Sequence, residues 1–310
     1  MTIQNILVAG NFEELFLHKL PSNDKHNYRF IPIENITHED LHWADVYVGS
    51  KPCENFNLKE LQWVHTFNAG VNNYLEIDGW EQNNVLLTRT VCSFGQRISE
   101  YCLSYILKEI QLHSFFSEKQ TNKTWEPKTP KMIKELSIVV FGTGEIGQEV
   151  AKTFDGLGAN VYGVSNSGKQ KEFFTKVVKV EDASSIIQTA DWIISTLPLT
   201  NETKKLFNKE FFSHMNGASF INVGRGATVD EFALIQALIS GNVKQAVLDV
   251  LTVEPLPTSS ELWSRNDVTI TPHISAVTEI GEAITCFLNT LHRVENNLEL
   301  QNKVDFKRGY

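Results

Sequence analysis

Short apolar runs alternate with longer amphipathic stretches along almost the whole chain of 310 residues. In the first third the runs are NILVAG, YRFIPI, DVYVGS, WVHTFNAGV and VLLTRT. In the middle they are SIVVFG, NVYGV, DWIISTLP, SFINVG, QAVLDV and VTITPH. This alternation is typical of parallel strands joined by crossover helices, so the sequence predicts an α/β fold.

The two sets of runs are separated by a long helical pattern. ISEYCLSYILKEIQLHSFF predicts a linking helix near 98–117, and the polar, proline-flanked SEKQTNKTWEPKTPK that follows predicts a loop. A second long helix, EIGEAITCFLNTLHRVENNLE, runs nearly to the C-terminus. The length suits two domains, and the linking helix marks their boundary.

Composition limits the classes of partner. The formal net charge of −9 argues against non-specific binding to nucleic acid or to anionic membranes, which needs a basic face. The four cysteines form no C-x-x-C pair, which suits a reducing compartment and neither a disulfide framework nor a zinc site. Because no signal peptide or apolar run of about 20 residues is present, we expect a cytoplasmic protein.

The segment VVFGTGEIGQEVA predicts a dinucleotide site. Gly142, Gly144 and Gly147 follow a strand and open a helix with the spacing G-x-G-x-x-G, which allows a tight turn, close approach of a pyrophosphate and close helix–strand packing. The amides of Glu145 and Ile146 would face the phosphates at the helix N-terminus. The alternative is an ordinary turn between strand and helix.

The end of the second strand of this domain favours NADP(H) over NAD(H). An acid there would accept hydrogen bonds from a ribose hydroxyl, whereas this chain has Ser165, Asn166 and Ser167 with Lys169 and Lys171 nearby. Small donors with nearby cations suit a 2′-phosphate. Under the alternative interpretation the lysines only face solvent and the cofactor is NAD(H).

Three candidate catalytic residues each follow a predicted strand. Arg225 follows SFINV, Glu254 follows AVLDV, and His273 ends VTITPH, so all three would meet at the carboxyl edge of a parallel sheet. Histidine can protonate the alkoxide that hydride transfer leaves, a carboxylate can orient the imidazole, and arginine can hold a keto acid. Taken singly, each also has an ordinary structural interpretation, as a strand-end ion pair, a solvated acid or a capped histidine.

These segments together resemble the D-isomer-specific 2-hydroxyacid dehydrogenase family. The similar segments are VVFGTGEIGQEVA, ADWIISTLPLTNETKKLFN, GASFINVGRGATVDEFALIQAL, AVLDVLTVEPLP and ITPHISAVT, in the family's order over about 137–278. The resemblance implies that Arg225 binds substrate and that Glu254 pairs with His273, the acid/base. It also implies that the loop FNAGVNNYL holds the substrate carboxylate on the amides of Gly70 and Val71, with Asn72 where the family often has Asp.

The resemblance implies two doubly wound parallel-sheet domains and a homodimer. One is a Rossmann domain over 98–278, and the other is a flavodoxin-like substrate domain made of 1–97 and 279–310. The activity implied is NAD(P)H-dependent reduction of a small 2-keto acid to the D-2-hydroxy acid, most like the glyoxylate/hydroxypyruvate reductase branch. Further cofactor contacts are implied from segments after the strands: Leu197, Pro198, Thr203, Val223, Gly224 and Asp249. The alternative is a non-catalytic NAD(P) sensor or corepressor on the same fold, which would have no need of all three catalytic side chains.

HEDLH, residues 38–42, matches the H-E-x-x-H pattern of zinc proteases. The match lies in a short polar segment just before a predicted strand, which leaves no long helix for an active site. We therefore expect His38 and His42 to be solvated helix residues, and we expect no metal.

Overall fold

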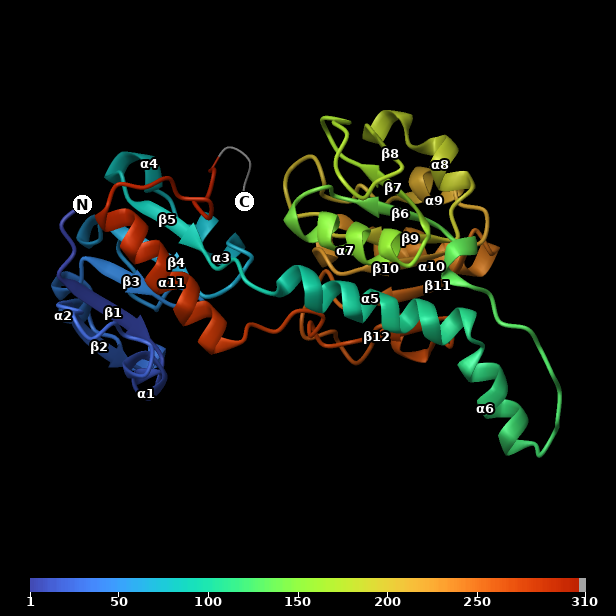
Figure 1. Cartoon of the computed structure of the whole chain (residues 1–310), viewed down its shortest axis with the longest axis horizontal. Coiled ribbons are helices and arrows are strands. Elements are labelled where there is room, and N and C mark those ends of the chain that lie inside the picture. The colour runs from blue at the N-terminus through green and yellow to red at the C-terminus, as the bar shows by residue number, and fades with distance from the viewer. Residues whose placement is uncertain (307–310) are drawn as a thin grey trace. The chain divides into compact units, whose positions relative to one another are not determined.

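The computed structural model describes residues 1–306 and divides into two compact units (Figure 1). The first unit combines Met1–Ser93 with Thr278–Tyr310, and the second is Phe94–Val277. Residues 307–310, which end the predicted substrate domain, lie outside the described chain. The boundary helix was predicted to begin at 98, whereas α5 begins at Phe94, where the second unit also begins.

The first unit is built on a five-stranded parallel sheet of order β2-β1-β3-β4-β5. This order is that of flavodoxin-like doubly wound sheets, in which the chain winds in opposite directions from β1 and from β3. The strands are β1 (Asn5–Ala9), β2 (Asn27–Ile31), β3 (Val46–Val48), β4 (Trp63–Thr66) and β5 (Leu86–Arg89). The helices are α1 (Glu13–Leu17), α2 (His38–Trp43), α3 (Asn72–Leu75), α4 (Trp80–Asn83) and α11 (Ile280–Glu295), with 3-10 turns η1 (Ile33–Asn35) and η2 (Leu58–Glu60).

Both faces of this sheet are buried, as its nearly continuous apolar strands require. On β1, Ile6 and Val8 pack in a cluster with side chains of α1 and α11. Leu7 between them packs on the opposite face with α2, α3 and α4. Helix α11 returns from the far end of the sequence to complete the first unit.

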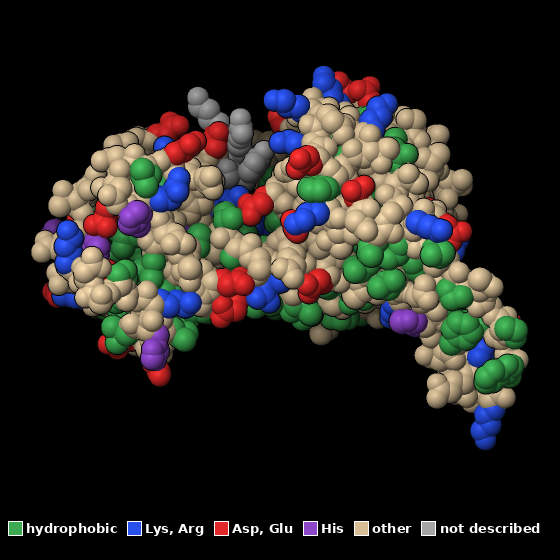
Figure 2. Space-filling view, in the orientation of Figure 1, with side chains coloured by type: hydrophobic (Ala, Val, Ile, Leu, Met, Phe, Trp, Pro, Cys, Tyr) green, Lys and Arg blue, Asp and Glu red, His purple; other side chains and the backbone are tan. Residues whose placement is uncertain are grey.

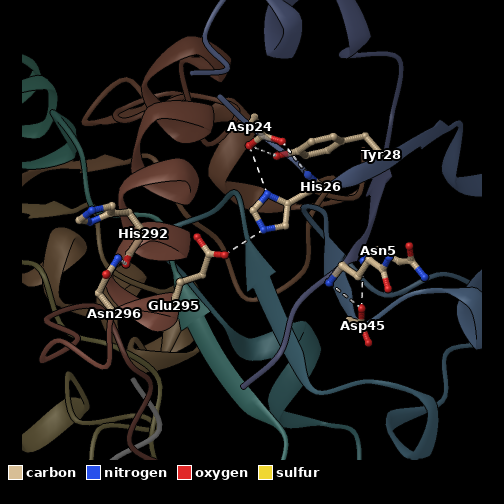
Figure 3. A network of polar contacts seen from close by, with 9 residues as sticks. Asn5, Asp24, His26, Tyr28, Asp45, His292, Glu295 and Asn296 are labelled. Atoms are coloured by element: carbon tan, nitrogen blue, oxygen red, sulfur yellow. Dashed lines mark hydrogen bonds and ion pairs between the residues drawn. The ribbon is translucent and has the colours of Figure 1, made fainter. Parts of the chain in front are cut away.

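A polar network ties α11 to the edge of this sheet (Figure 3). His26 Nδ1 lies 3.2 Å from Asp24 Oδ2, and His26 Nε2 lies 3.1 Å from Glu295 Oε1 on α11. The Tyr28 hydroxyl donates to Asp24, and burial raises the pKa of Tyr28. Because the His26 side chain is only 5% exposed, both carboxylates act on a nearly buried ring.

The second unit is built on a seven-stranded parallel sheet of order β12-β11-β10-β9-β6-β7-β8. Helices α5 and α7 cover one face, and α8, α9 and α10 cover the other. The strands are β6 (Ser137–Phe141), β7 (Asn160–Val164), β8 (Lys176–Val178), β9 (Trp192–Ser195), β10 (Ala218–Asn222), β11 (Val243–Leu248) and β12 (Val268–Ile270). The helices are α5 (Phe94–Ile110), α6 (His113–Thr121), α7 (Glu145–Gly156), α8 (Ser184–Gln188), α9 (Lys209–Ser213) and α10 (Glu231–Ser240), with 3-10 turns η3 (Ile133–Glu135), η4 (Val180–Asp182), η5 (Gly226–Thr228) and η6 (Glu261–Ser264).

The predicted α/β class with two parallel sheets is confirmed, and each of the eleven apolar runs overlaps a strand. Two local predictions were wrong. The linking helix is two helices, because Leu112 has a left-handed backbone (φ 61°) that ends the first of them. Helix α6 then continues to Thr121, into the segment predicted as a loop. Strand β8 was not predicted.

No helix of the described chain is long and apolar enough to cross a membrane.

Candidate active site

The glycine loop between β6 and α7 has the shape that a pyrophosphate site requires. A Cβ on Gly147 would lie 1.8 Å from the Gly142 carbonyl oxygen, so the helix packs directly on the strand end. Gly142 has a φ of +97°, which L side chains rarely adopt. A Cβ on Gly144 would meet nothing within 4 Å, so space is open beside the first turn of α7. There the amides of Glu145 and Ile146 begin a helix of 12 residues, and these features fit a dinucleotide.

The loop after β7 carries the predicted phosphate-binding residues. The Ser165 hydroxyl is buried and has no hydrogen-bond partner in the described chain, which fits a site for a missing polar group. Ser167 and Lys169 are exposed. Asn166 donates a hydrogen bond of 2.7 Å to Glu202, from the segment after β9. Glu202 was missed by the sequence analysis, because only the fold brings that segment beside this loop.

Two neighbouring loops shape the rest of the cofactor cradle. A Cβ on Gly224 would lie 2.4 Å from the Leu197 carbonyl oxygen, so this glycine permits close backbone contact between the loops after β9 and β10. Val223 is buried, and its backbone amide donates a hydrogen bond to the Ser195 carbonyl. The Thr203 hydroxyl donates to the Pro198 carbonyl at 2.6 Å, and it is nearly buried. That hydroxyl therefore maintains the shape of the loop.

Arg225 lies in a turn that the backbone fixes from several sides. Its carbonyl accepts hydrogen bonds from the Asn222 amide group (3.1 Å) and the Thr228 hydroxyl (2.6 Å). A Cβ on Gly226 would lie 1.9 Å from the Leu251 carbonyl carbon, so only glycine fits there. Burial lowers the pKa of Arg225 and the nearby Glu254 carboxylate opposes this, so the guanidinium stays cationic near neutrality.

His273 and Glu254 form the pair that the sequence predicts. His273 Nδ1 lies 2.8 Å from Glu254 Oε2, while Glu254 Oε1 accepts a hydrogen bond of 2.9 Å from the Leu251 amide. With Nδ1 bound to the carboxylate, Nε2 is the nitrogen that can exchange a proton with a ligand. The His273 side chain is 51% exposed, which leaves the ring accessible.

Asp249, which the sequence analysis predicts as a cofactor contact, also holds the loop after β12. Its carboxylate is buried and accepts three hydrogen bonds from the segment around His273, and the cofactor contact stays a prediction. The donors are the Thr271 hydroxyl (2.6 Å), the Ile274 amide (2.8 Å) and the Ser275 amide (2.9 Å). The Thr271 hydroxyl also lies 2.6 Å from the Tyr101 hydroxyl on α5. Asp249 therefore fixes the loop that carries His273, which has a left-handed backbone (φ 55°).

The remaining predicted residues lie in the first unit. Gly70 and Val71 follow β4 and directly precede α3. His38 and His42 belong to the six-residue helix α2, and His42 Nδ1 lies 2.6 Å from Glu60 Oε2. Within residues 1–306 no group of three or more His, Cys, Asp or Glu side chains could hold a metal ion.

The glycine loop, Arg225, Glu254 and His273 each follow a strand of the same parallel sheet. Residues 103–275 match the family model for D-isomer specific 2-hydroxyacid dehydrogenase, NAD binding domain. The chain belongs to the D-isomer specific 2-hydroxyacid dehydrogenase family. It is therefore an oxidoreductase that acts on CH–OH donors, and the matched region is its NAD-binding domain.

Two kinds of comparison place the chain within the 2-hydroxyacid dehydrogenases. It is 33% identical over 260 residues to glyoxylate/hydroxypyruvate reductase A of Serratia proteamaculans strain 568, covering 82% of this chain and 83% of that one. Among solved structures, a D-isomer specific 2-hydroxyacid dehydrogenase from Xanthobacter autotrophicus Py2, in complex with NADPH and MES, superposes with a TM-score of 0.89 at 27% identity over all of both chains. A probable 2-hydroxyacid dehydrogenase from Rhizobium etli CFN 42, in complex with NADP, HEPES and L(+)-tartaric acid, has a TM-score of 0.84 at 25% identity and covers 99% of this chain and 100% of that one.

Proposed function

We propose that the protein reduces a small 2-keto acid to the D-2-hydroxy acid with NADPH. The observation that carries this proposal is the His273–Glu254 hydrogen bond of 2.8 Å, near the partly buried Arg225 and on the same parallel sheet as a glycine loop with the geometry of a pyrophosphate site. The similarity to glyoxylate/hydroxypyruvate reductase A supports glyoxylate and hydroxypyruvate as the first acids to test.

A bound nicotinamide supplies the hydride that adds to the keto carbon. Arg225 binds the carboxylate and polarises the neighbouring carbonyl, since a guanidinium can donate to two oxygens at once. Protonated His273 donates its Nε2 proton to the oxygen that becomes the new hydroxyl. Glu254 opposes the charge of the imidazolium and holds the ring in the orientation that directs Nε2 toward a ligand.

The test is the loss of nicotinamide absorbance with glyoxylate or hydroxypyruvate. His273→Ala should lower turnover by about 10² or more, because a positioned acid/base contributes that much. Arg225→Ala should weaken both keto-acid binding and turnover. His292→Ala, which removes an exposed histidine of α11, is the matched control and should leave turnover unchanged. Full activity of either site variant would contradict the role proposed for that residue, and tight cofactor binding without turnover would favour a sensor.

For the cofactor we propose a preference for NADPH over NADH. The support is the loop after β7, where the unpartnered Ser165 hydroxyl lies near the exposed Ser167 and Lys169 and no carboxylate ends the strand. Two structural neighbours that hold NADPH or NADP agree with this preference. Lys169→Ala should lower kcat/KM for NADPH and leave NADH use unchanged, whereas equal use of both by the wild type would contradict the proposal.

We also propose that the protein is a homodimer. Apolar side chains lie on the surface of the protein around α6 and the segment after it (Figure 2). In that segment the side chain of Trp125 is 99% exposed and that of Met132 is 56% exposed. A surface of this kind is unusual for a monomer and typical of an interface. Analytical ultracentrifugation should give a dimer for the wild type and more monomer for Trp125→Ser, and a monomeric wild type would contradict the proposal.

The four free cysteines are consistent with the cytoplasmic location that we propose.

A further inference from the structure

A cavity of about 410 Å³ opens at the carboxyl ends of β1, β2, β3 and β4 in the first unit. Its lining includes residues 9–12 after β1 and residues 50–51 after β3. In the order β2-β1-β3-β4-β5 the winding direction changes between β1 and β3, and doubly wound sheets bind ligands at that point. The cavity therefore lies where this fold is expected to bind a ligand.

Buried side chains fix the wall of this cavity after β3. The Tyr74 hydroxyl donates to the Gly49 carbonyl at 2.8 Å, and the Tyr47 hydroxyl donates to the Lys51 carbonyl at 2.9 Å. Asn68 donates to the Ser50 carbonyl at 3.0 Å. Because both tyrosines are fully buried, the backbone of Lys51 is held in place before any ligand binds.

The lining combines apolar side chains, among them Phe12 and Ile33, with polar ones, and its two charged side chains, Lys51 and Glu34, give it no net charge. Within the described chain, neither the Lys51 ammonium nor the Glu34 carboxylate forms an ion pair with the other or with a third group. A second carboxylate or a phosphate on a ligand would meet Glu34 as well as Lys51. Hydroxyl groups, in contrast, can donate to Glu34 and accept from Lys51. Neutral hydrogen-bonding side chains complete the polar lining: Asn11, Ser50, Asn68 and Asn73.

We propose that this cavity holds the side chain of the substrate, and that the substrate is a 2-keto acid with a neutral polyhydroxylated chain of several carbons. The inference rests on the proposed function, in which Arg225 binds the carboxylate, and on the family resemblance, which implies that the amides of Gly70 and Val71 bind it as well. Asn68 and Asn73, which bracket those two residues, both line the cavity. The volume is in the range of pockets for small molecules and exceeds the need of a two- or three-carbon acid.

The first experiment compares four acids with NADPH: glyoxylate, 2-keto-D-gluconate, 2-ketohexanoate and 2-ketoglutarate. The polyhydroxylated acid should have the highest kcat/KM of the three longer acids, by about tenfold or more, since hydrogen bonds to charged groups contribute that much. A preference for 2-ketohexanoate or for 2-ketoglutarate would overturn the inference while the proposed function stands. No turnover of any acid would refute the proposed function itself, and the inference with it.

The second experiment uses Lys51→Met, with Lys59→Met as the control. Lys59 is an exposed lysine of η2 that does not line the cavity. Lys51→Met should lower kcat/KM for 2-keto-D-gluconate by about tenfold and leave glyoxylate within about twofold, because glyoxylate has no side chain to reach the cavity. An equal loss with both acids, or no loss with either, would show that Lys51 does not contact the substrate side chain.

Discussion

Replacing Thr271 by valine tests how His273, the proposed acid/base, is held in place. The Thr271 hydroxyl lies 2.6 Å from Asp249 Oδ1 and 2.6 Å from the Tyr101 hydroxyl, so it joins α5 to the carboxylate that fixes the His273 loop. Valine has nearly the same shape but no hydroxyl. Asp249 Oδ1 would then keep only the Ile274 amide as a donor, and the Tyr101 hydroxyl would lose its partner.

The cost can be worked out from these contacts. A hydrogen bond to an ionised carboxylate contributes roughly 1.5–3 kcal/mol, and a hydroxyl left without a partner adds to this, so we expect a loss of about 2–4 kcal/mol of stability. Because β12 is the edge strand, the loop after it has a neighbouring strand on one side only. The loop should therefore move when the bond is lost, and displacing His273 should lower kcat by about tenfold or more.

Urea denaturation and steady-state kinetics with NADPH measure the two effects on the same samples. Thr269→Val is the matched control, since Thr269 lies on β12, directly before the loop that contains Thr271, and no hydrogen bond of its hydroxyl is seen in the described chain. Thr271→Ser should restore both stability and kcat, because it keeps the hydroxyl. If Thr271→Val behaved like Thr269→Val in both assays, the Asp249 contacts would not be what positions His273.

Other changes test separate parts of the structure. Glu254→Gln should lower kcat at least about tenfold, since an amide cannot oppose the imidazolium charge of His273; an unchanged kcat in the same absorbance assay would contradict the pairing. Gly226→Ala should cost about 1–3 kcal/mol in urea unfolding, because its Cβ would overlap the Leu251 backbone, whereas Gly156→Ala, with open space around it, should cost nothing. Burial lowers the pKa of His65 to about 3. As the pH falls below about 6.5, the ordinary pKa of histidine, His65 is therefore protonated in the unfolded chain but stays neutral in the folded chain. His65 should therefore lower the free energy of unfolding by about 2 kcal/mol between about pH 7 and pH 5. Urea unfolding at a series of pH values measures this, and the same pH dependence in His65→Gln as in the wild type would show that His65 is not its source.

The strands and the catalytic candidates were predictable because both depend on local patterns. An apolar run bounded by glycine or proline marks a buried strand wherever it occurs, and a polar residue just after such a run lies at the carboxyl edge of a parallel sheet. The His273–Glu254 contact followed from that placement. The partners of Asp249 did not, because an acid at a strand end can face a ligand or a neighbouring loop, and only the fold decides which.

The same limit explains the other misses. Glu202 and Asn166 are 36 positions apart and meet only because β9 and β7 lie on either side of β6. Strand β8 (Lys176–Val178) has two valines between Lys176 and Lys179, so no apolar run marks it in the sequence. The break at Leu112 depends on a left-handed backbone at a residue type that rarely adopts one, so composition gave no sign of it.

His273 must satisfy two demands that one side chain cannot meet alone. In the proposed mechanism its ring has to be accessible to a substrate, and because half of its side chain is exposed, packing alone does not hold it. Asp249 is buried, and its carboxylate fixes the chain on both sides of the histidine through Thr271, Ile274 and Ser275. Glu254 then needs only to orient a ring whose backbone is already placed. The exposed His273 thus provides accessibility and the buried Asp249 provides rigidity. Because Thr271 donates to Asp249, its replacement by valine should lower kcat.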